Sequence, residues 1–338
     1  MYRVAVDAMG GDFAPQAVVK GALRALKNFP KLAIYLVGRE EEIRAHLPRR
    51  KPKHLEIIPA TQVVAMDDSP IDALRSKPDS SIRRAFELAK SGQAQAVVSA
   101  GNSGAVLATA LFLLGRLSGV SRPAIATVLP TIKKNAVLID SGANVDCKPQ
   151  HLVQFATMGA VFCEQILGLP SPRVGLLSIG EEGGKGNTLV KRTHKLLSES
   201  NLNYVGNIEG RDIYKGDVDV IVCDGFVGNI CLKLSEGLAE ALMAMMAQEV
   251  YQNKLAKMGF LLARGALKRF KKRIDWRERG GAPLLGIDGV VIISHGRSDE
   301  IAIQNAIGTA REFIEQRLVE KLRQALTNEN LKARSVTG

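Results

Sequence analysis

The first residues that could bind a ligand follow an apolar segment at the start of the chain. Residues 3–7 have the composition of a buried β-strand, and they run directly into Ala-Met-Gly-Gly-Asp at 8–12. In open α/β sheets, ligands bind at the carboxyl ends of the strands, and glycine lets a ligand approach the main chain closely. We therefore expect this loop to bind substrate. Its candidate ligands are Asp7, Gly10, Gly11 and Asp12.

The same arrangement recurs after three later apolar segments, in the loops Ser99-Ala-Gly-Asn-Ser-Gly104, Ile139-Asp-Ser-Gly-Ala-Asn144 and Asp224-Gly-Phe-Val-Gly-Asn229. Free amides at a helix start bind phosphate without any lysine, helped by the helix dipole. Asparagine both donates and accepts hydrogen bonds, so Asn102 and Asn229 are expected phosphate ligands. Four such loops favour one shared cleft over independent turns. The further substrate-binding candidates are Ser99, Gly101, Ser103, Gly104, Asp140, Ser141, Asn144, Asp224, Gly225 and Gly228.

A lysine surrounded by glycines follows the apolar residues 173–179, in Gly180-Glu-Glu-Gly-Gly-Lys-Gly-Asn187. This is not a Walker A loop, which has four residues between its first glycine and its Gly-Lys pair, and Ser or Thr after that pair. Here three residues separate Gly180 from the Gly-Lys pair, and a glycine follows it. A cation at the end of a strand suits a phosphate or a developing oxyanion. Lys185 is therefore a candidate catalytic residue, and Gly186 and Asn187 are candidate substrate ligands. The alternative is a solvated loop lysine.

His295 is the histidine that we place in the cleft, because Ile293-Ser-His-Gly-Arg297 follows an apolar run. The chain has no Gly-x-Ser-x-Gly elbow and no evident Cys–His pair, so a covalent acyl-enzyme is not supported. Cysteines 147, 163, 223 and 231 lack metal-ligand spacing and are expected to be reduced thiols. These features indicate chemistry on phosphate by positioning and charge stabilisation. Asn229 and His295 join Lys185 as catalytic candidates, with no metal or cofactor.

Strand-length apolar runs alternate with helical periodicity, which predicts an α/β domain over residues 1–338. Strands are predicted at 3–7, 32–37, 55–58, 95–99, 124–129, 136–140, 173–179, 203–207, 218–223 and 289–293. Helices are predicted at 15–28, 39–46, 80–90, 103–115, 150–167, 187–199, 232–250 and 299–326. No strand is followed by G-x-G-x-x-G, which counts against a Rossmann dinucleotide site. The uncharged run 91–115 is interrupted by the polar loop 99–104, so we do not predict a membrane span there.

The net charge of +12 is concentrated in residues 251–280, which hold ten Lys or Arg and only two acidic residues. Before them, residues 238–247 are apolar almost all round, which predicts burial on several sides. We expect a long helix, a bend near 257–260 and a second basic helix. This helical excursion, at about 236–280, is predicted to serve dimerisation and membrane or carrier-protein contact. The contact candidates are Lys254, Lys257, Met258, Phe260, Leu261, Leu262, Arg264, Lys268 and Arg269.

Five segments, in order, resemble the bacterial phosphate acyltransferases, and the resemblance runs from residue 3 to about 325. They are residues 6–12, 99–104, 185–187, 224–229 and 294–296. The resemblance implies a three-layer α/β/α fold with a mixed, mostly parallel sheet and a protruding helical hairpin. The fold would be similar to that of isocitrate and isopropylmalate dehydrogenases and of phosphotransacetylase.

The same resemblance implies a cytoplasmic homodimer that moves a fatty acyl group from acyl carrier protein to inorganic phosphate. The acyl phosphate would supply a membrane glycerol-3-phosphate acyltransferase in phospholipid synthesis, and peripheral contact with an anionic membrane would suit that role.

Two other functions compete with this one. An NAD-dependent decarboxylating dehydrogenase of similar fold would need metal-binding carboxylates and an adenosine pocket, and neither is evident. Nucleic-acid binding would rest on the basic segment alone. Single-strand binders interleave aromatic and basic residues, and here only Phe260, Phe270 and Trp276 lie between the first and last basic residues of the segment, 254 and 279. We therefore expect no nucleic-acid partner.

Overall fold

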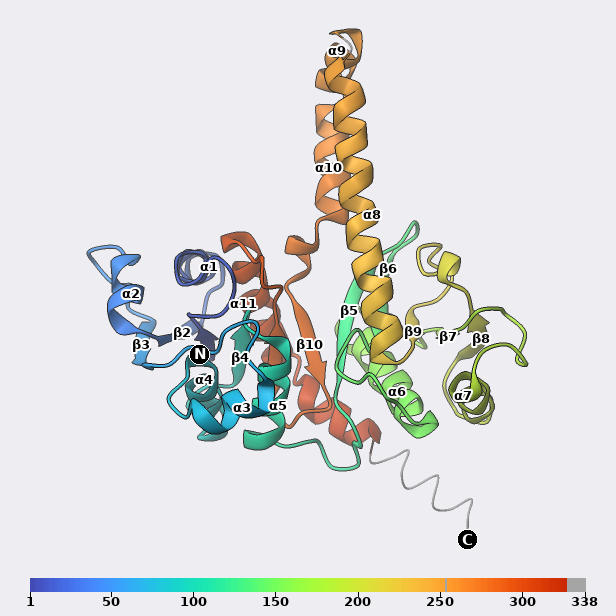
Figure 1. The fold of residues 1–338 in the computed structure, drawn as a ribbon, viewed down its shortest axis with the longest axis horizontal. Helices are drawn as coiled ribbons and strands as arrows, with labels where there is room; N and C mark the ends of the chain where they lie inside the picture. The colour runs from blue at the N-terminus through green and yellow to red at the C-terminus, as the bar shows by residue number, and fades with distance from the viewer. Residues whose placement is uncertain (253, 327–338) are drawn as a thin grey trace.

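The computed structural model describes residues 1–252 and 254–326. Within them the strands are β1 (Tyr2–Asp7), β2 (Leu32–Gly38), β3 (Leu55–Pro59), β4 (Ala96–Ser99), β5 (Ala124–Pro130), β6 (Asn135–Ile139), β7 (Val174–Leu177), β8 (Tyr204–Ile208), β9 (Val220–Val222), β10 (Ala282–Leu285) and β11 (Val290–Ile293). They form one sheet in the order β3-β2-β1-β4-β11-β10-β5-β6-β9-β7-β8 (Figure 1). Each of the ten strands predicted above overlaps one of these.

The sheet consists of two parallel blocks that meet at β10 and β5. One block is β3-β2-β1-β4-β11, in which Ala5 of β1 pairs with Tyr35 of β2 and Val97 of β4. The other block is β6-β9-β7-β8. β10 is antiparallel to both β11 and β5, and β5 is antiparallel to β6. The sheet is therefore mixed but mostly parallel, as expected.

Helices cover both faces of the sheet. They are α1 (Gln16–Asn28), α2 (Glu40–Ala45), α3 (Pro70–Ser76), α4 (Ser81–Lys90), α5 (Ser103–Leu113), α6 (Pro149–Gln165), α7 (Thr188–Ser198), α8 (Gly225–Gln252), α9 (Lys254–Leu262), α10 (Arg264–Ile274) and α11 (Glu300–Glu315), with short 3-10 turns η1 (Gly210–Asp212) and η2 (Trp276–Arg279).

The alternation of side chains along β1 shows how the layers are built. Val4 and Val6 enter a core that includes residues of α1 and α11, whereas Ala5 enters a separate core with residues of α4 and α5. Successive strand residues point to opposite faces of a sheet, so the fully buried run predicts helices on both sides. The observed fold is the expected three-layer α/β/α sandwich.

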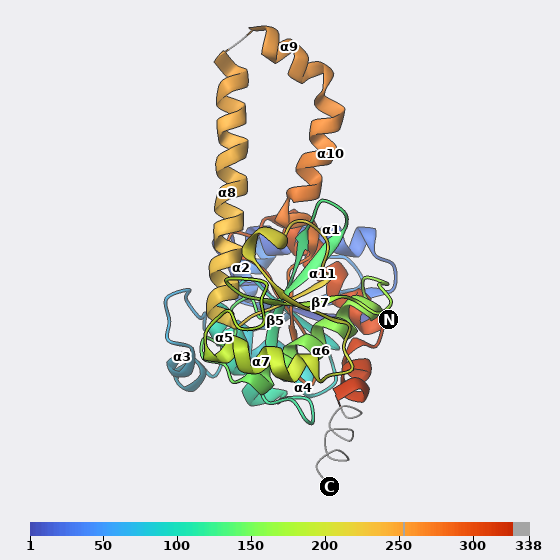
Figure 2. The same cartoon turned by 90° about the vertical axis from the view of Figure 1, so that its right-hand side faces the viewer.

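A helical hairpin leaves the body of the molecule, as Figures 1 and 2 show: α8 rises from it, α9 crosses at the tip and α10 returns. The predicted bend at 257–260 is wrong, because those residues lie inside α9 and the chain turns at Ala263. The expected burial of residues 238–247 is also wrong within one chain, since the side chains of Leu238 and Leu242 are 56% and 57% exposed.

Other differences from the prediction are local. β10 and α3 were not predicted, α8 begins at Gly225 rather than at 232, and the helix predicted over 299–326 is interrupted at Gln316–Arg317, where Arg317 has a φ of 54°. None of the helices formed by the described residues has the length and apolarity needed to cross a bilayer.

Candidate active site

A cavity of about 1420 Å³ lies at the junction of the two parallel blocks. Its floor includes residues of β5 and β10, and its walls come from α8, α10 and η2. Four of the predicted site residues line it: Ser103 after β4, Ser141 after β6, Asn229 near the start of α8, and His295 after β11. The ends of four strands, two from each block, thus supply polar groups to one space, as the shared-cleft hypothesis requires.

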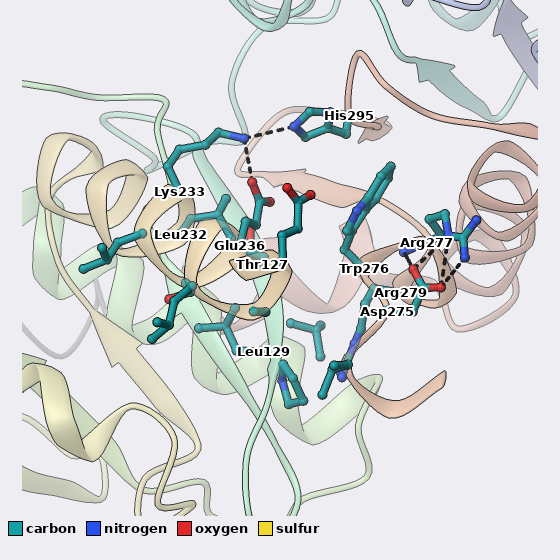
Figure 3. Close-up of a pocket in the computed structure, with 18 of the residues that line it drawn as sticks. Thr127, Leu129, Leu232, Lys233, Glu236, Asp275, Trp276, Arg277, Arg279 and His295 are labelled. Atoms are coloured by element: carbon teal, nitrogen blue, oxygen red, sulfur yellow. Dashed lines mark hydrogen bonds and ion pairs between the residues drawn. The ribbon is translucent and has the colours of Figure 1, made fainter. Parts of the chain in front are cut away.

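Lys233 also lines the cavity and was not predicted as a site residue from the sequence. Its Nζ lies 3.0 Å from Nε2 of His295 and donates to Glu236 Oε2 at 2.9 Å. In Figure 3 the lysine and the imidazole reach toward each other from opposite walls. The ring of Trp276 packs beside the imidazole, with 5.2 Å between the ring centroids. Lys233 is therefore a cation in direct contact with a predicted catalytic residue.

His295 is half-buried, and its pKa is lowered below the ordinary value. Burial is the main cause, and the positive charges of Lys233 and Arg297 act in the same direction, against Glu236 and Asp12. The imidazole is therefore uncharged near neutral pH.

The loop after β1 and the loop after β4 are joined through Asp7, whose carboxylate is buried. It accepts hydrogen bonds from Ser99 Oγ at 2.7 Å and from the Met9 N–H at 3.2 Å. Burial raises the pKa of Asp7, and hydrogen bonds from Ser81 and Ser99 oppose that rise. Neither Asp7 nor Ser99 lines the cavity. The structure therefore places both residues as supports of the loop rather than as direct ligands.

The loop after β6 is organised by a second buried carboxylate, that of Asp140. It accepts hydrogen bonds from the N–H groups of Ile125, Gly142, Ala143 and Asn144 and from Nδ2 of Asn144, at 2.7–3.1 Å. Burial raises its pKa despite these donors. Asn144 also donates to the Pro123 carbonyl at 2.7 Å. Asp140 and Asn144 thus hold the loop that presents Ser141 to the cavity.

The glycines of these loops permit close approach of one main chain to another. A Cβ added at Gly228 would lie 1.9 Å from the Asp140 carbonyl oxygen, and one at Gly225 would lie 2.7 Å from the Asn144 carbonyl oxygen. A Cβ at Gly10 would lie 2.6 Å from both Asp7 Oδ2 and the Gly101 nitrogen. Packing explains these glycines without a ligand. Of the predicted residues, Gly10, Gly11, Asp12, Gly101, Gly104, Asp224, Gly225 and Gly228 do not line the cavity.

Asn102 is held in place by the protein itself. Its Oδ1 accepts from the Ala105 N–H at 3.0 Å and caps α5, while Nδ2 donates to the carbonyls of Met66 and Asp68 at 3.0 and 2.9 Å. The side chain is 8% exposed. Its hydrogen-bonding groups are therefore already used, and the adjacent Ser103 is the residue of this loop that lines the cavity.

The loop that carries Lys185 is also at the carboxyl end of a strand, β7, but Lys185 is exposed and does not line the cavity. Asn187 caps α7 by accepting from the Val190 N–H at 2.9 Å, and Asn207 donates to the Glu182 carbonyl at 3.0 Å. Gly186 adopts a φ of 96°. The structure thus fixes the two ends of this loop and leaves the lysine in solvent.

Cys231 lines the cavity, but it does not provide a nucleophile. Burial raises the pKa of its thiol above the ordinary value, with a further contribution from the Asp224 charge. Because the thiolate is the reactive form, this cysteine is a poor acyl acceptor.

The cavity is polar at one end and apolar along the hairpin. From the Ser141, Asn229, Lys233 and His295 end it continues between α8 and α10, where its lining is mostly aliphatic or aromatic. These residues are Leu232, Leu238, Leu242, Met243, Phe270 and Ile274. Such a shape can hold a reacting polar group with a long hydrocarbon tail.

Comparison with known proteins identifies the family of this chain. A family model described as fatty acid synthesis protein matches residues 2–321. The chain belongs to this family. A relative from Syntrophotalea carbinolica named phosphate acyltransferase is 56% identical over 329 residues, which are 97% of this chain and 94% of the relative. Another of that name, from Geobacter sulfurreducens, is 52% identical over 331 residues, 96% and 95% of the two chains. This chain is therefore an acyltransferase enzyme.

Solved structures bear out the fold that the resemblance implied. A phosphotransacetylase from Streptococcus pyogenes aligns with a TM-score of 0.61 at 19% identity, over 93% of this chain and 94% of that chain. A branched-chain phosphotransacylase from Enterococcus faecalis V583 aligns with a TM-score of 0.58 at 16% identity, over 96% and 99%. At these identities the likeness concerns the fold alone.

Proposed function

We propose that this enzyme transfers a fatty acyl group from acyl carrier protein to inorganic phosphate and releases an acyl phosphate. The observation that carries the proposal is the cavity, which joins a polar end to an apolar channel in a member of an acyltransferase family. The polar end suits phosphate and the thioester carbonyl. The apolar part suits the acyl chain.

The transfer needs no covalent enzyme intermediate. A phosphate oxygen attacks the thioester carbon, the C–O bond forms, and the tetrahedral oxyanion collapses with cleavage of the C–S bond. The leaving thiolate takes a proton from water. Phosphate dianion is already a nucleophile at neutral pH, so positioning and charge stabilisation are the tasks left to the protein. We assign phosphate binding to Asn229, a polar contact in the cavity to His295, and oxyanion stabilisation to Lys185, which lies outside the cavity lining and therefore has to move to reach the substrate.

The direct test uses purified enzyme, acyl carrier protein thioester and inorganic phosphate. We expect free carrier thiol and acyl phosphate, trapped as the hydroxamate with hydroxylamine, in equal amounts. Omitting phosphate should abolish both products. Failure to release thiol when phosphate is saturating would exclude the proposed reaction.

We propose a homodimer built partly on α8. Leu238, Leu242 and Met245 are 56–61% exposed on this helix, an extensive apolar face for a solvent-exposed helix. Light scattering should give the mass of two chains at micromolar concentration, and Met245→Arg should shift the protein towards the monomer because a charge is then buried in the contact. A native monomer at that concentration would contradict the dimer.

We also propose that the tip of the hairpin binds an anionic membrane peripherally, while the body stays in the cytoplasm. Met258, Leu261 and Leu262 are 64%, 68% and 89% exposed on α9. The exposed cations Lys257, Arg264, Lys268 and Arg269 lie beside them; the side chain of Lys254 lies outside the described residues. Apolar residues flanked by cations suit an interfacial helix, and each cation near anionic lipid contributes about 1 kcal/mol.

Phe260/Leu261/Leu262→Ser should therefore lose binding to anionic vesicles in a flotation assay and keep its activity on soluble substrate. The matched control is Ile71/Val205→Ser, which changes exposed apolar residues on the body and should float like the native protein. If the native protein does not bind anionic vesicles at low salt, the membrane proposal is wrong, and docking of the acidic carrier protein takes its place as the proposed role of these cations. Membrane contact would bring the acyl phosphate to a membrane glycerol-3-phosphate acyltransferase.

A further inference from the structure

Two nitrogen donors face each other at the polar end of the cavity. Lys233 Nζ is 3.0 Å from His295 Nε2, and its ammonium charge is supported by Glu236 Oε2 at 2.9 Å. The other ring nitrogen, Nδ1, accepts a hydrogen bond from the Arg297 N–H at 3.1 Å. A neutral imidazole has one donor and one acceptor nitrogen, so it cannot accept from both Lys233 and Arg297. We assign the hydrogen to Nε2, because the Arg297 N–H is held by the main chain and needs Nδ1 as its acceptor. The ammonium and the Nε2–H therefore point at one another, and no acceptor separates them.

We propose that Lys233 and His295 form the binding site for the inorganic phosphate that receives the acyl group. This inference rests on the proposed function and names the residues that hold its acceptor. An anionic oxygen beside the pair, within hydrogen-bond distance of both nitrogens, accepts from both and removes their conflict. Charge-assisted hydrogen bonds of this kind are stronger than neutral ones. The attacking oxygen is then another of the four, left free to approach the thioester carbon.

The surroundings of the pair fit an anion. Asn229 lies one helical turn before Lys233 on α8, a spacing that places both on the same face, and it lines the same cavity. Lys233 is 51% exposed, so phosphate can reach it from solvent. The groups that face His295 are the cations Lys233 and Arg297 and the acids Glu236 and Asp12. The Trp276 ring supports the imidazole from the side.

The test is calorimetric titration of the full-length enzyme with inorganic phosphate. Hydrogen bonds to charged groups contribute about 1.5–3 kcal/mol, so Lys233→Met should weaken phosphate binding by about 10-fold or more. It should also raise the phosphate KM in the acyl-transfer assay. Lys271→Met makes the same substitution elsewhere on the cavity lining and should leave phosphate affinity unchanged. Equal affinity in native enzyme and Lys233→Met would overturn the assignment.

A second measurement needs no substitution. In nitrogen NMR spectra of the native protein, His295 should carry its hydrogen on Nε2, and phosphate should shift that resonance. A hydrogen on Nδ1, or an Nε2 resonance that ignores saturating phosphate, would also overturn the assignment. The two ideas fail separately. If the native enzyme produces acyl phosphate and Lys233→Met binds phosphate with native affinity, only the assignment of this site is wrong. If the native enzyme binds phosphate through Lys233 but transfers no acyl group, only the proposed reaction is wrong.

Discussion

Replacing Asp140 with alanine is expected to lower the free energy of unfolding by about 3–5 kcal/mol. The carboxylate accepts five hydrogen bonds within the loop after β6 and from β5, and it is fully buried. Without it, several buried N–H groups lose their acceptor, and each such loss costs about 1–3 kcal/mol. Water that enters the space left by the side chain can accept some of these hydrogen bonds, which offsets part of the total loss of stability. Denaturant unfolding followed by circular dichroism measures the change.

The control for this prediction is Asp146→Ala. Asp146 is exposed in the same segment, so its loss should change the free energy of unfolding by less than about 0.5 kcal/mol. Asp140→Asn should lie between the two, because one oxygen remains as an acceptor while an NH2 group faces the donors of Asn144. A change below 1 kcal/mol in Asp140→Ala would show that this carboxylate does not organise the loop.

The strands were predictable because fully buried parallel strands are continuous apolar runs, and a buried run followed by glycine and a polar residue marks a strand end. β10 was not predicted, because its sequence lacks these features. It contains Pro283, which cannot donate to the sheet, and it is only four residues long; proline inside a run argues against a strand. Yet β10 occupies the centre of the sheet, between β11 and β5.

The residues that line the cavity were harder to predict than the loops that carry them. Asn102 and Ser103 are adjacent and both suit phosphate, but the asparagine caps α5 and only the serine lines the cavity. Which of two neighbours turns inward depends on tertiary contacts, here those with the carbonyls of residues 66 and 68. A motif therefore indicates a loop more reliably than a ligand.

Lys233 was missed because the helix predicted over 232–250 left Asn229 outside it, so the face that the two residues share was not recognised. Glycine disfavours helix interiors, so Gly225 and Gly228 suggested a loop, and the helix was predicted from 232. Their lack of a Cβ instead lets the helix start against the main chain of Asp140. With the helix beginning at Gly225, the polar residues 229, 233, 236 and 240 recur at intervals of three and four on one face. That spacing was the signal available in the sequence.

Replacing Lys185 with alanine is expected to lower kcat about 100-fold, which corresponds to about 2.7 kcal/mol of transition-state stabilisation. The lysine is exposed in a glycine-rich loop, and its loss should leave the free energy of unfolding almost unchanged. The loop also contains an unused polar group, since the buried Oγ of Ser178 has no hydrogen-bond partner among the described residues. Lys191→Ala, which removes an exposed lysine from α7, should retain native turnover.

Substitution of Lys185 and substitution of Lys233 should change different steady-state parameters. If Lys185 stabilises the oxyanion, which exists only after phosphate has attacked, its loss lowers kcat and leaves the phosphate KM nearly unchanged. If Lys233 holds phosphate before the attack, its loss appears mainly in that KM. A native kcat in Lys185→Ala would show that this lysine is a solvated loop residue with no catalytic role. The oxyanion would then be stabilised from the cavity, where Lys233 is the candidate cation.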